Sequence, residues 1–178
     1  HFNTAIAPKF APFLAPTQPK PLQVIAVCMI DDAIEFGGAQ MHHYLPQSLP
    51  ILLQNMKCDH ATLRQSSAYG IAQMCNKAPD FAVTQMHNIT TALVDLTQRA
   101  DAKEEDNEGA TDNALFALGC LLFSKNPTLK DPAAWSGINR SGIGELWLKG
   151  LPLTADENQA VCAAHQLCNA IEAMDTDI

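Results

Sequence analysis

The sequence predicts an all-α solenoid, in which antiparallel helix pairs stack side by side with a right-handed superhelical trend. A pattern of small residues, with larger apolar residues at helical spacing, returns about every forty residues, in segments 26–36, 64–75, 110–123 and 159–171. Strand signals are nearly absent, and the sequence has no Asn-Gly or Asp-Gly hairpin turn. Aromatic residues make up only 6% of the 178 residues. The small residues that predominate allow stacked helices to approach closely.

Seven helices fit the whole sequence, and the first half of the chain is expected to contain four of them. Prolines in segment 16–21 separate the first two helices. Gly37-Gly38 closes the second, because glycine tolerates the left-handed conformation of a helix C-cap. Apolar residues at i, i+3, i+4 and i+7 give the second and third helices one apolar face each. These residues are Leu22, Ile25, Ala26, Met29, Ala33 and Phe36, then Leu45, Leu49, Leu52, Leu53 and Met56.

The second half is expected to contain the other three. Ala78-Pro79-Asp80 provides the break before the first of these, and segment 151–154 the break before the last. Thr154 followed by Glu157 has the spacing of a capping box at the start of the last helix. Segment 126–144 contains tryptophan and several glycines, which indicates a longer, irregular connection.

Acidic residues outnumber basic ones, with 19 Asp and Glu against 11 Lys and Arg and a net charge of −8. This balance opposes nucleic-acid binding, which needs a basic surface, and favours basic protein partners. No apolar run is long enough to span a bilayer. The densest acidic run, in segment 101–112, is either a solvated spacer or a contact for basic cargo. The candidate cargo contacts are Asp101, Glu104, Glu105, Asp106 and Glu108.

Soft metal ligands occur at spacing three in Cys162-x-x-His165-x-x-Cys168. On one helix each step of three residues drifts around the face by about 60°, or about 120° over the three positions, so they could bind a metal only with an outside ligand. The six cysteines lie in or beside predicted helices, which favours reduced thiols that pack as small apolar groups. We therefore expect no metal site and no cofactor.

The sequence contains no motif that predicts catalysis. Gly142-Ile-Gly144 is too short for a dinucleotide loop and follows no predicted strand. A Gly-x-Ser-x-Gly elbow and a P-loop are both absent from the sequence. Asp31 and Asp32 are adjacent, so on a helix they point about 100° apart and favour a polar face or a helix contact. We expect a binding protein without catalytic residues.

Six local matches, in the same order, carry a resemblance to a known family. They are Met29-Ile-Asp-Asp-Ala-Ile-Glu35, Arg64-Gln-Ser-Ser-Ala-Tyr-Gly-Ile-Ala-Gln-Met74, Arg99-Ala-Asp-Ala-Lys103, Asn107-Glu-Gly-Ala-Thr-Asp-Asn-Ala114, Leu146-Trp-Leu-Lys-Gly-Leu-Pro152 and Leu167-Cys-Asn-Ala-Ile-Glu172. Together they resemble HEAT repeats of the importin-beta (karyopherin-beta) nuclear transport receptors. The match runs from about Phe10 to Glu172 and is most similar to the Ran-binding importins that carry ribosomal proteins and histones.

The resemblance implies about four HEAT repeats across 1–178, in a C-terminal fragment of a longer receptor. Outer A helices would be 22–37, 61–77, 110–124 and 156–173, and inner B helices 2–15, 40–57, 80–98 and 143–150. Family B helices often carry a central proline. Pro12 and Pro50 keep it, whereas Thr91 and Glu145 stand in its place, which implies that those two B helices are straighter.

The same resemblance implies binding rather than chemistry, in a receptor that shuttles between cytoplasm and nucleus. Basic cargo would bind the B-helix face, and FG-repeat nucleoporins would bind slots between A helices, at residues that the sequence does not identify. Ran with GTP would act mainly through repeats that are outside this chain. Two alternatives stay open: a HEAT scaffold or adaptor without Ran dependence, and a small metal-dependent helical enzyme built on Cys162, His165 and Cys168.

Overall fold

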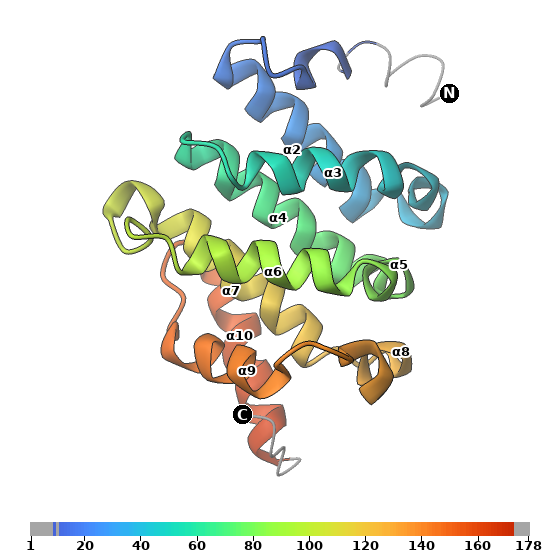
Figure 1. The fold of residues 1–178 in the computed structure, drawn as a ribbon, viewed down its shortest axis with the longest axis vertical. Helices are drawn as coiled ribbons and strands as arrows, with labels where there is room; N and C mark the ends of the chain where they lie inside the picture. The colour runs from blue at the N-terminus through green and yellow to red at the C-terminus, as the bar shows by residue number, and fades with distance from the viewer. Residues whose placement is uncertain (1–8, 10, 173–178) are drawn as a thin grey trace.

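The computed structural model describes residue 9 and residues 11–172, and every regular element in this part of the chain is a helix. The helices form two layers of roughly parallel members (Figure 1). This arrangement confirms the predicted all-α fold of stacked helix pairs. The handedness of the superhelix stays a prediction. Of the predicted helix at 2–15, most lies outside the described residues, and its described end forms the short 3-10 helix η2 (Ala11–Leu14).

The A layer lies behind in the view of Figure 1 and contains the long helices. These are α2 (Lys20–Phe36), α4 (Ala61–Lys77), α7 (Glu105–Leu122) and α10 (Glu157–Glu172). Helix α4 packs between α2 and α7, and α7 also contacts α10. Small buried residues such as Ala68, Ala72, Ala114 and Ala117 let these backbones approach. The prediction that small residues line the helix seams is confirmed.

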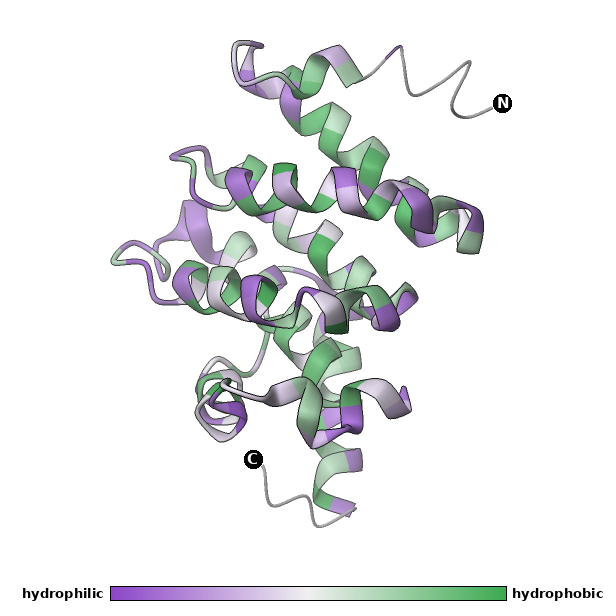
Figure 2. Cartoon of the chain, turned by 45° about the vertical axis from the view of Figure 1, so that its right-hand side comes forward, coloured by the Kyte–Doolittle hydropathy of each residue, from purple (hydrophilic) through white to green (hydrophobic). Residues whose placement is uncertain are grey.

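The B layer lies in front and consists of α3 (Leu45–Asn55), α5 (Pro79–Thr84) with α6 (Met86–Thr97), and α9 (Arg140–Lys149). The 3-10 helix η3 (Gly38–Tyr44) joins α2 to α3. Two short elements, α8 (Pro127–Lys130) and η4 (Pro132–Trp135), precede α9. The core lies between the layers, where Leu52, Leu93 and Trp147 are fully buried. Figure 2 shows hydrophilic residues gathered on the connections and outward helix turns.

None of the helices that the structure describes combines the length and the apolar character that crossing a bilayer requires.

Several boundaries differ from the sequence prediction, each for a local reason. The helix expected at 40–57 begins as 3-10 turns and becomes α-helical at Leu45, where Pro46 occupies the first turn and needs no backbone donor. The helix expected at 80–98 is interrupted at Gln85, whose φ of −117° and ψ of 12° leave the α region. That B helix is therefore broken, which corrects the expectation that the helix containing Thr91 would be straighter.

One helix start and one helix cap were also predicted wrongly. Helix α7 begins at Glu105 rather than near 110, so three of the acidic residues form its first turn. Acidic side chains are favourable there, because the N-terminus of a helix carries partial positive charge. The N-cap of α10 is provided by Asp156, whose Oδ1 accepts a 2.9 Å hydrogen bond from the Gln159 backbone N–H. Thr154, the expected capping residue, is instead engaged with α7.

Segment 126–144 forms short helices joined by turns, which confirms an irregular connection up to Asn139, whereas α9 already begins at Arg140. Trp135 anchors this connection because its Nε1 donates a 2.8 Å hydrogen bond to the Leu129 carbonyl and its ring is buried.

Buried polar side chains link the A helices. Arg64, only 1% exposed, donates from Nη1 to the Cys58 carbonyl at 2.7 Å and from Nη2 to Asn107 Oδ1 of α7. In the same seam, Asn113 Nδ2 donates to the Gln65 carbonyl at 2.9 Å. These bonds fix the register of α7 on α4, and therefore where the B helices attached to them lie.

A second set of polar contacts holds the segment that leads into α10. Asp112 Oδ2 accepts hydrogen bonds from the backbone N–H groups of Thr154 at 2.6 Å and Ala155 at 2.9 Å. The Thr154 hydroxyl donates to Glu108 Oε1 at 2.6 Å. Helix α7 therefore carries the docking point for the next helix pair.

Candidate interaction surface

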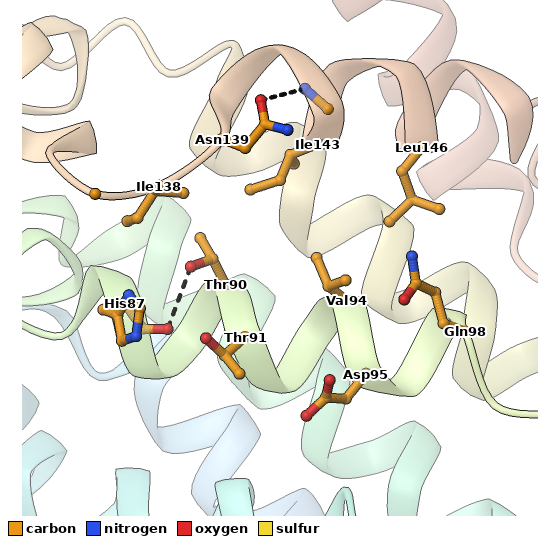
Figure 3. Close-up of a pocket in the computed structure, with 12 residues that line it drawn as sticks. His87, Thr90, Thr91, Val94, Asp95, Gln98, Ile138, Asn139, Ile143 and Leu146 are labelled. Atoms are coloured by element: carbon orange, nitrogen blue, oxygen red, sulfur yellow. Dashed lines mark hydrogen bonds between the residues drawn. The ribbon is translucent and has the colours of Figure 1, made fainter.

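A groove of about 360 Å³ runs between two B-layer helices, α6 and α9 (Figure 3). Helix α6 forms one wall, and α9 with the turn before it forms the other. The groove lies on the B layer, the face on which the resemblance to importin-beta receptors implied cargo binding. The residues that line it are His87, Thr90, Thr91, Val94, Asp95, Gln98, Gly137, Ile138, Asn139, Gly142, Ile143 and Leu146.

The walls of this groove are mainly apolar, with polar groups near the rim. Thr90 turns its hydroxyl back onto its own helix, where Oγ1 donates to the Met86 carbonyl at 2.8 Å. Asn139 Oδ1 accepts the Gly142 N–H at 3.0 Å and so caps α9. Both polar groups are therefore engaged in local structure. Val94, Ile138 and Leu146 remain half-buried and available for an apolar contact.

The ridge beside the groove carries three exposed polar residues of α6, His87, Thr91 and Asp95, at spacing four. All three also line a second depression of about 250 Å³, between α6 and α3, together with Leu53 and Lys57. One stripe of α6 therefore borders two adjacent grooves. Sequence reasoning missed His87 and Asp95, because their importance depends on which helices flank α6. The i, i+4, i+8 spacing of these polar residues on α6 was the signal that could have found them.

The predicted acidic contact begins at one end of the groove. Gln98 lines the groove, and Asp101 follows three residues later, within about 10 Å of chain. Asp101 and Glu104 lie in the connection, while Glu105, Asp106 and Glu108 lie in the first turn of α7. The five residues therefore lie in a structured turn and a helix start, and not in a free linker.

Two of these five acids make contacts within the chain. Arg99 Nε donates to Asp101 Oδ1 at 2.8 Å and Nη2 to Oδ2 at 3.0 Å, and this bidentate hydrogen bonding holds the pKa of Asp101 below its usual value. Glu108 accepts the Thr154 hydroxyl. Glu104, Glu105 and Asp106 are exposed, and no side-chain hydrogen bond or ion pair engages them within the described residues. These three are the acids most available to a partner.

The seams between neighbouring A helices, where FG slots are expected, are crossed by direct contacts. Between α2 and α4, the Tyr69 hydroxyl donates to Glu35 Oε2 at 2.7 Å and Cys28 Sγ lies 3.7 Å from Ser66 Oγ. Between α4 and α7, Asn113 bonds to Gln65. The location of FG slots stays a prediction.

The candidate metal ligands on α10 have different surroundings. Cys162 is half-buried, and burial raises the pKa of its thiol, whereas His165 and Cys168 are exposed. Within the described residues, no three His, Cys, Asp or Glu side chains are grouped so that they could hold a metal ion.

Comparison with known proteins shows a similarity to an importin subunit. No family model matches the sequence. The chain is 24% identical, over 155 residues, to a protein named importin subunit beta-3 from Saccharomyces cerevisiae. The match covers 87% of this chain and 13% of that protein. The chain is therefore similar to one segment of an importin-beta-type protein, and its helical architecture agrees with that similarity.

Proposed function

We propose that this chain is a HEAT-repeat segment of a nuclear import receptor, and that it provides a binding surface for basic protein cargo. The observation that carries the proposal is the groove between α6 and α9, with Asp95 on its ridge and the acidic turn at its Gln98 end. The similarity to importin subunit beta-3 supports the class of protein. The cargo site is supported by the chemistry of the surface.

The groove suits an extended peptide that alternates basic and aliphatic side chains. Aliphatic side chains would pack on Val94, Ile138 and Leu146, and basic ones would meet Asp95 and the exposed acids. Exposed charge pairs contribute about 0–1 kcal/mol each, so useful affinity requires several pairs together with apolar burial. The interaction is therefore expected to weaken as salt rises.

In the complete receptor, we propose that FG-repeat nucleoporins bind between A helices and that Ran with GTP, acting through other repeats, releases cargo. Such a receptor would shuttle between cytoplasm and nucleus. Bending of the stacked repeats, each of which contacts only its neighbours, would couple Ran binding to cargo release. A scaffold without Ran dependence would bind partners equally with and without Ran-GTP, which separates the alternative experimentally.

The cargo surface can be tested with a fluorescent peptide that alternates Lys and Val, titrated with the 178-residue chain. We expect the charge reversal Asp95→Lys to weaken binding about tenfold or more, because Asp95 borders both grooves. The matched control is Asp32→Lys, which changes an exposed acid on α2, away from the groove. Equal affinities for the Asp95→Lys variant and the parent chain would exclude this groove as the cargo site.

The acidic turn is tested separately with the triple variant Glu104→Gln, Glu105→Gln and Asp106→Asn. It removes the three exposed acids and keeps the contacts of Asp101 and Glu108. The control of equal charge change is Asp32→Asn, Glu157→Gln and Glu172→Gln, all exposed in the structure. If the acidic turn is only a spacer, both triple variants bind the peptide equally at low salt.

A further inference from the structure

Thr154 belongs to a sequence pattern that the fold does not use as expected. A threonine followed three positions later by an acid was predicted to cap α10, yet the cap is Asp156. The same pattern suits acidophilic Ser/Thr protein kinases, whose basic groups bind acids on the C-terminal side of the hydroxyl. In the sequence only Thr128 and Thr154 have an acid at that distance, and only Thr154 has acids both two and three positions later.

The segment that contains Thr154 is accessible to an enzyme. Thr154 and the residues at 155–157 are all exposed. Between the end of α9 and the start of α10 the chain forms no helix or strand. A segment of this kind gives up few backbone hydrogen bonds when an enzyme binds it in extended form. Leu153, only 3% exposed, anchors the segment in the core.

Two carboxylates of α7 hold this segment in place. The Thr154 hydroxyl donates to Glu108 Oε1 at 2.6 Å. Asp112 Oδ2 accepts the backbone N–H groups of Thr154 at 2.6 Å and Ala155 at 2.9 Å. Glu108 is exposed and can turn toward solvent when its partner changes, whereas Asp112 is only 6% exposed and has no such freedom. The contact is therefore sensitive to any negative charge added at Thr154.

We propose that Thr154 is a phosphorylation site for an acidophilic Ser/Thr kinase, and that its modification releases the segment before α10 from α7. In the reaction, Thr154 Oγ1 forms a bond to the γ-phosphorus of ATP. The bond from that phosphorus to the β–γ bridging oxygen breaks, and ADP leaves with its electron pair. The hydroxyl proton passes to the base of the kinase. The site does not depend on the proposed cargo groove.

Phosphorylation replaces a hydrogen-bond donor with an anion. The ester oxygen has no hydrogen left for Glu108, and the phosphoryl group adds about −1.5 to −2 charges at neutral pH. These charges lie beside the backbone N–H groups that Asp112 accepts. Since like charges repel at short range and the Asp112 side chain is buried, we expect its two bonds to the segment to break. The effect should stay local, because stacked repeats contact only their neighbours.

Modification is tested by treating the 178-residue chain with ATP and purified casein kinase 2, an acidophilic Ser/Thr kinase. Tandem mass spectrometry then locates the phosphoryl group. We expect it on Thr154 and not on Thr128, whose hydroxyl donates to Asp80 at 3.0 Å and which has Lys130 two positions later. Thr154→Ser should keep the modification, and Thr154→Ala should lose it. Thr128→Ala is the control and should be modified like the parent. Absence of phosphate from Thr154 would overturn the proposal.

Release of the segment is measured by amide hydrogen exchange in the phosphorylated and unphosphorylated chains. We expect exchange at Thr154 and Ala155 to accelerate about tenfold or more, because both amides lose a charged acceptor. The amides of α4 should not change. If the phosphoryl group instead bound the N-terminus of α10, the segment would be held more firmly and its exchange would slow. Slower or unchanged exchange would therefore reject the release.

Glu108→Gln tests whether charge repulsion causes the release. The variant removes one of the two carboxylates and supplies an amide N–H that a phosphoryl oxygen can accept, so phosphorylation should accelerate exchange less than in the parent. Asp106→Asn is the control of equal charge change, because Asp106 is exposed and lies about 200° around the helix from Glu108. Matching thermal unfolding of the two unphosphorylated variants verifies folding. Equal acceleration in both variants would contradict the proposed cause of the release.

Discussion

The carboxyl group of Asp31 on α2 lies directly against Gly70 on α4, so closely that a Cβ on Gly70 would come within 2.2 Å of Asp31 Oδ1. The same Cβ would lie 2.9 Å from Leu52 Cδ1 of α3. Gly70 is therefore the point at which three helices approach one another. Asp31 is 3% exposed, and its Oδ1 has no hydrogen-bond partner among the described residues.

Gly70→Ala should destabilise the fold by about 1–3 kcal/mol. Alanine is the better helix former by about 1 kcal/mol, but the added methyl meets a buried carboxyl group and forces α2 away from α4. Urea unfolding followed by circular dichroism measures the change. Gly109→Ala on α7 is the control, because its Cβ would meet only the end of the Gln65 side chain, which can move. The prediction fails if both variants are stabilised equally.

Stability should fall as pH rises from about 5 to 8, in part because of Asp31. Burial, together with the nearby Asp32 and Glu35, raises the pKa of Asp31 from 3.8 to about 8, and Tyr69 of α4 also faces this group. The folded chain therefore keeps a proton that the unfolded chain releases above pH 4, so the stabilisation present at low pH is lost as pH approaches 8. Above about pH 8 both states are ionised and this contribution is constant.

Asp31→Asn tests this expectation, because asparagine stays neutral in both states. We expect the variant to unfold at a higher urea concentration than the parent at pH 8. Its free energy of unfolding should be higher by an amount on the order of a few kcal/mol at pH 8, with a smaller difference at pH 5. Glu104→Gln, which changes an exposed acid that does not act on Asp31, controls for the change in net charge. Parallel pH profiles for the Asp31→Asn variant and the parent would show that Asp31 does not titrate in this range.

Arg64→Met should destabilise the chain by about 2–5 kcal/mol. The substitution preserves much of the apolar stem, but it leaves the Cys58 carbonyl and Asn107 Oδ1 without their buried donor. Arg99→Met is the matched control, since Arg99 forms a partly exposed ion pair with Asp101 and should cost under about 1 kcal/mol. Thermal unfolding compares the two. Similar losses would mean that the buried contacts of Arg64 contribute little beyond those of a surface pair.

Asp112→Ala should destabilise the segment that precedes α10, because the backbone N–H groups of Thr154 and Ala155 lose their charged acceptor. A loss of about 2–3 kcal/mol is expected from the two charge-assisted bonds. Hydrogen exchange should accelerate first at Thr154 and Ala155, before the amides of α4 change. Asp106→Ala, an exposed acid on the same helix, serves as the control. Uniform acceleration throughout the chain would indicate general destabilisation instead of local release.

Helix identity was predictable from the sequence where the determinants are local. The helix expected at 61–77 is observed as Ala61–Lys77, and its N-cap is a neighbour in sequence, His60, whose Nδ1 accepts the Leu63 N–H at 3.3 Å. The boundary of α7 was not predictable in this way. The acidic run in segment 101–112 left the helix start near 110, yet burial of Asn107 against Arg64, 43 residues away in sequence, makes that segment the first turn of a helix.

The candidate site depends on distant residues even more strongly. Glu104, Glu105 and Asp106 could be identified as an acidic run, because a charge run is visible in the sequence. The groove could not, since Val94 and Leu146 face each other only through the packing of α6 and α9 on α7. Periodicity gives each helix its apolar face, but it does not say which two helices leave a space between them.

The enclosure of α4 between α2 and α7 sets how the chain tolerates genetic change. Ten of the residues of α4 are buried, among them Arg64, Gly70 and Cys75, so almost every turn meets another helix. Helix α2, by contrast, exposes large apolar residues such as Ile25 and Phe36. In a library of random single substitutions, the depleted positions should therefore concentrate in the middle of the stack. A map of mutational sensitivity would follow the order of the helices, with its maximum at α4 and the adjacent α7, which has 13 buried residues, rather than the distance from any binding cavity.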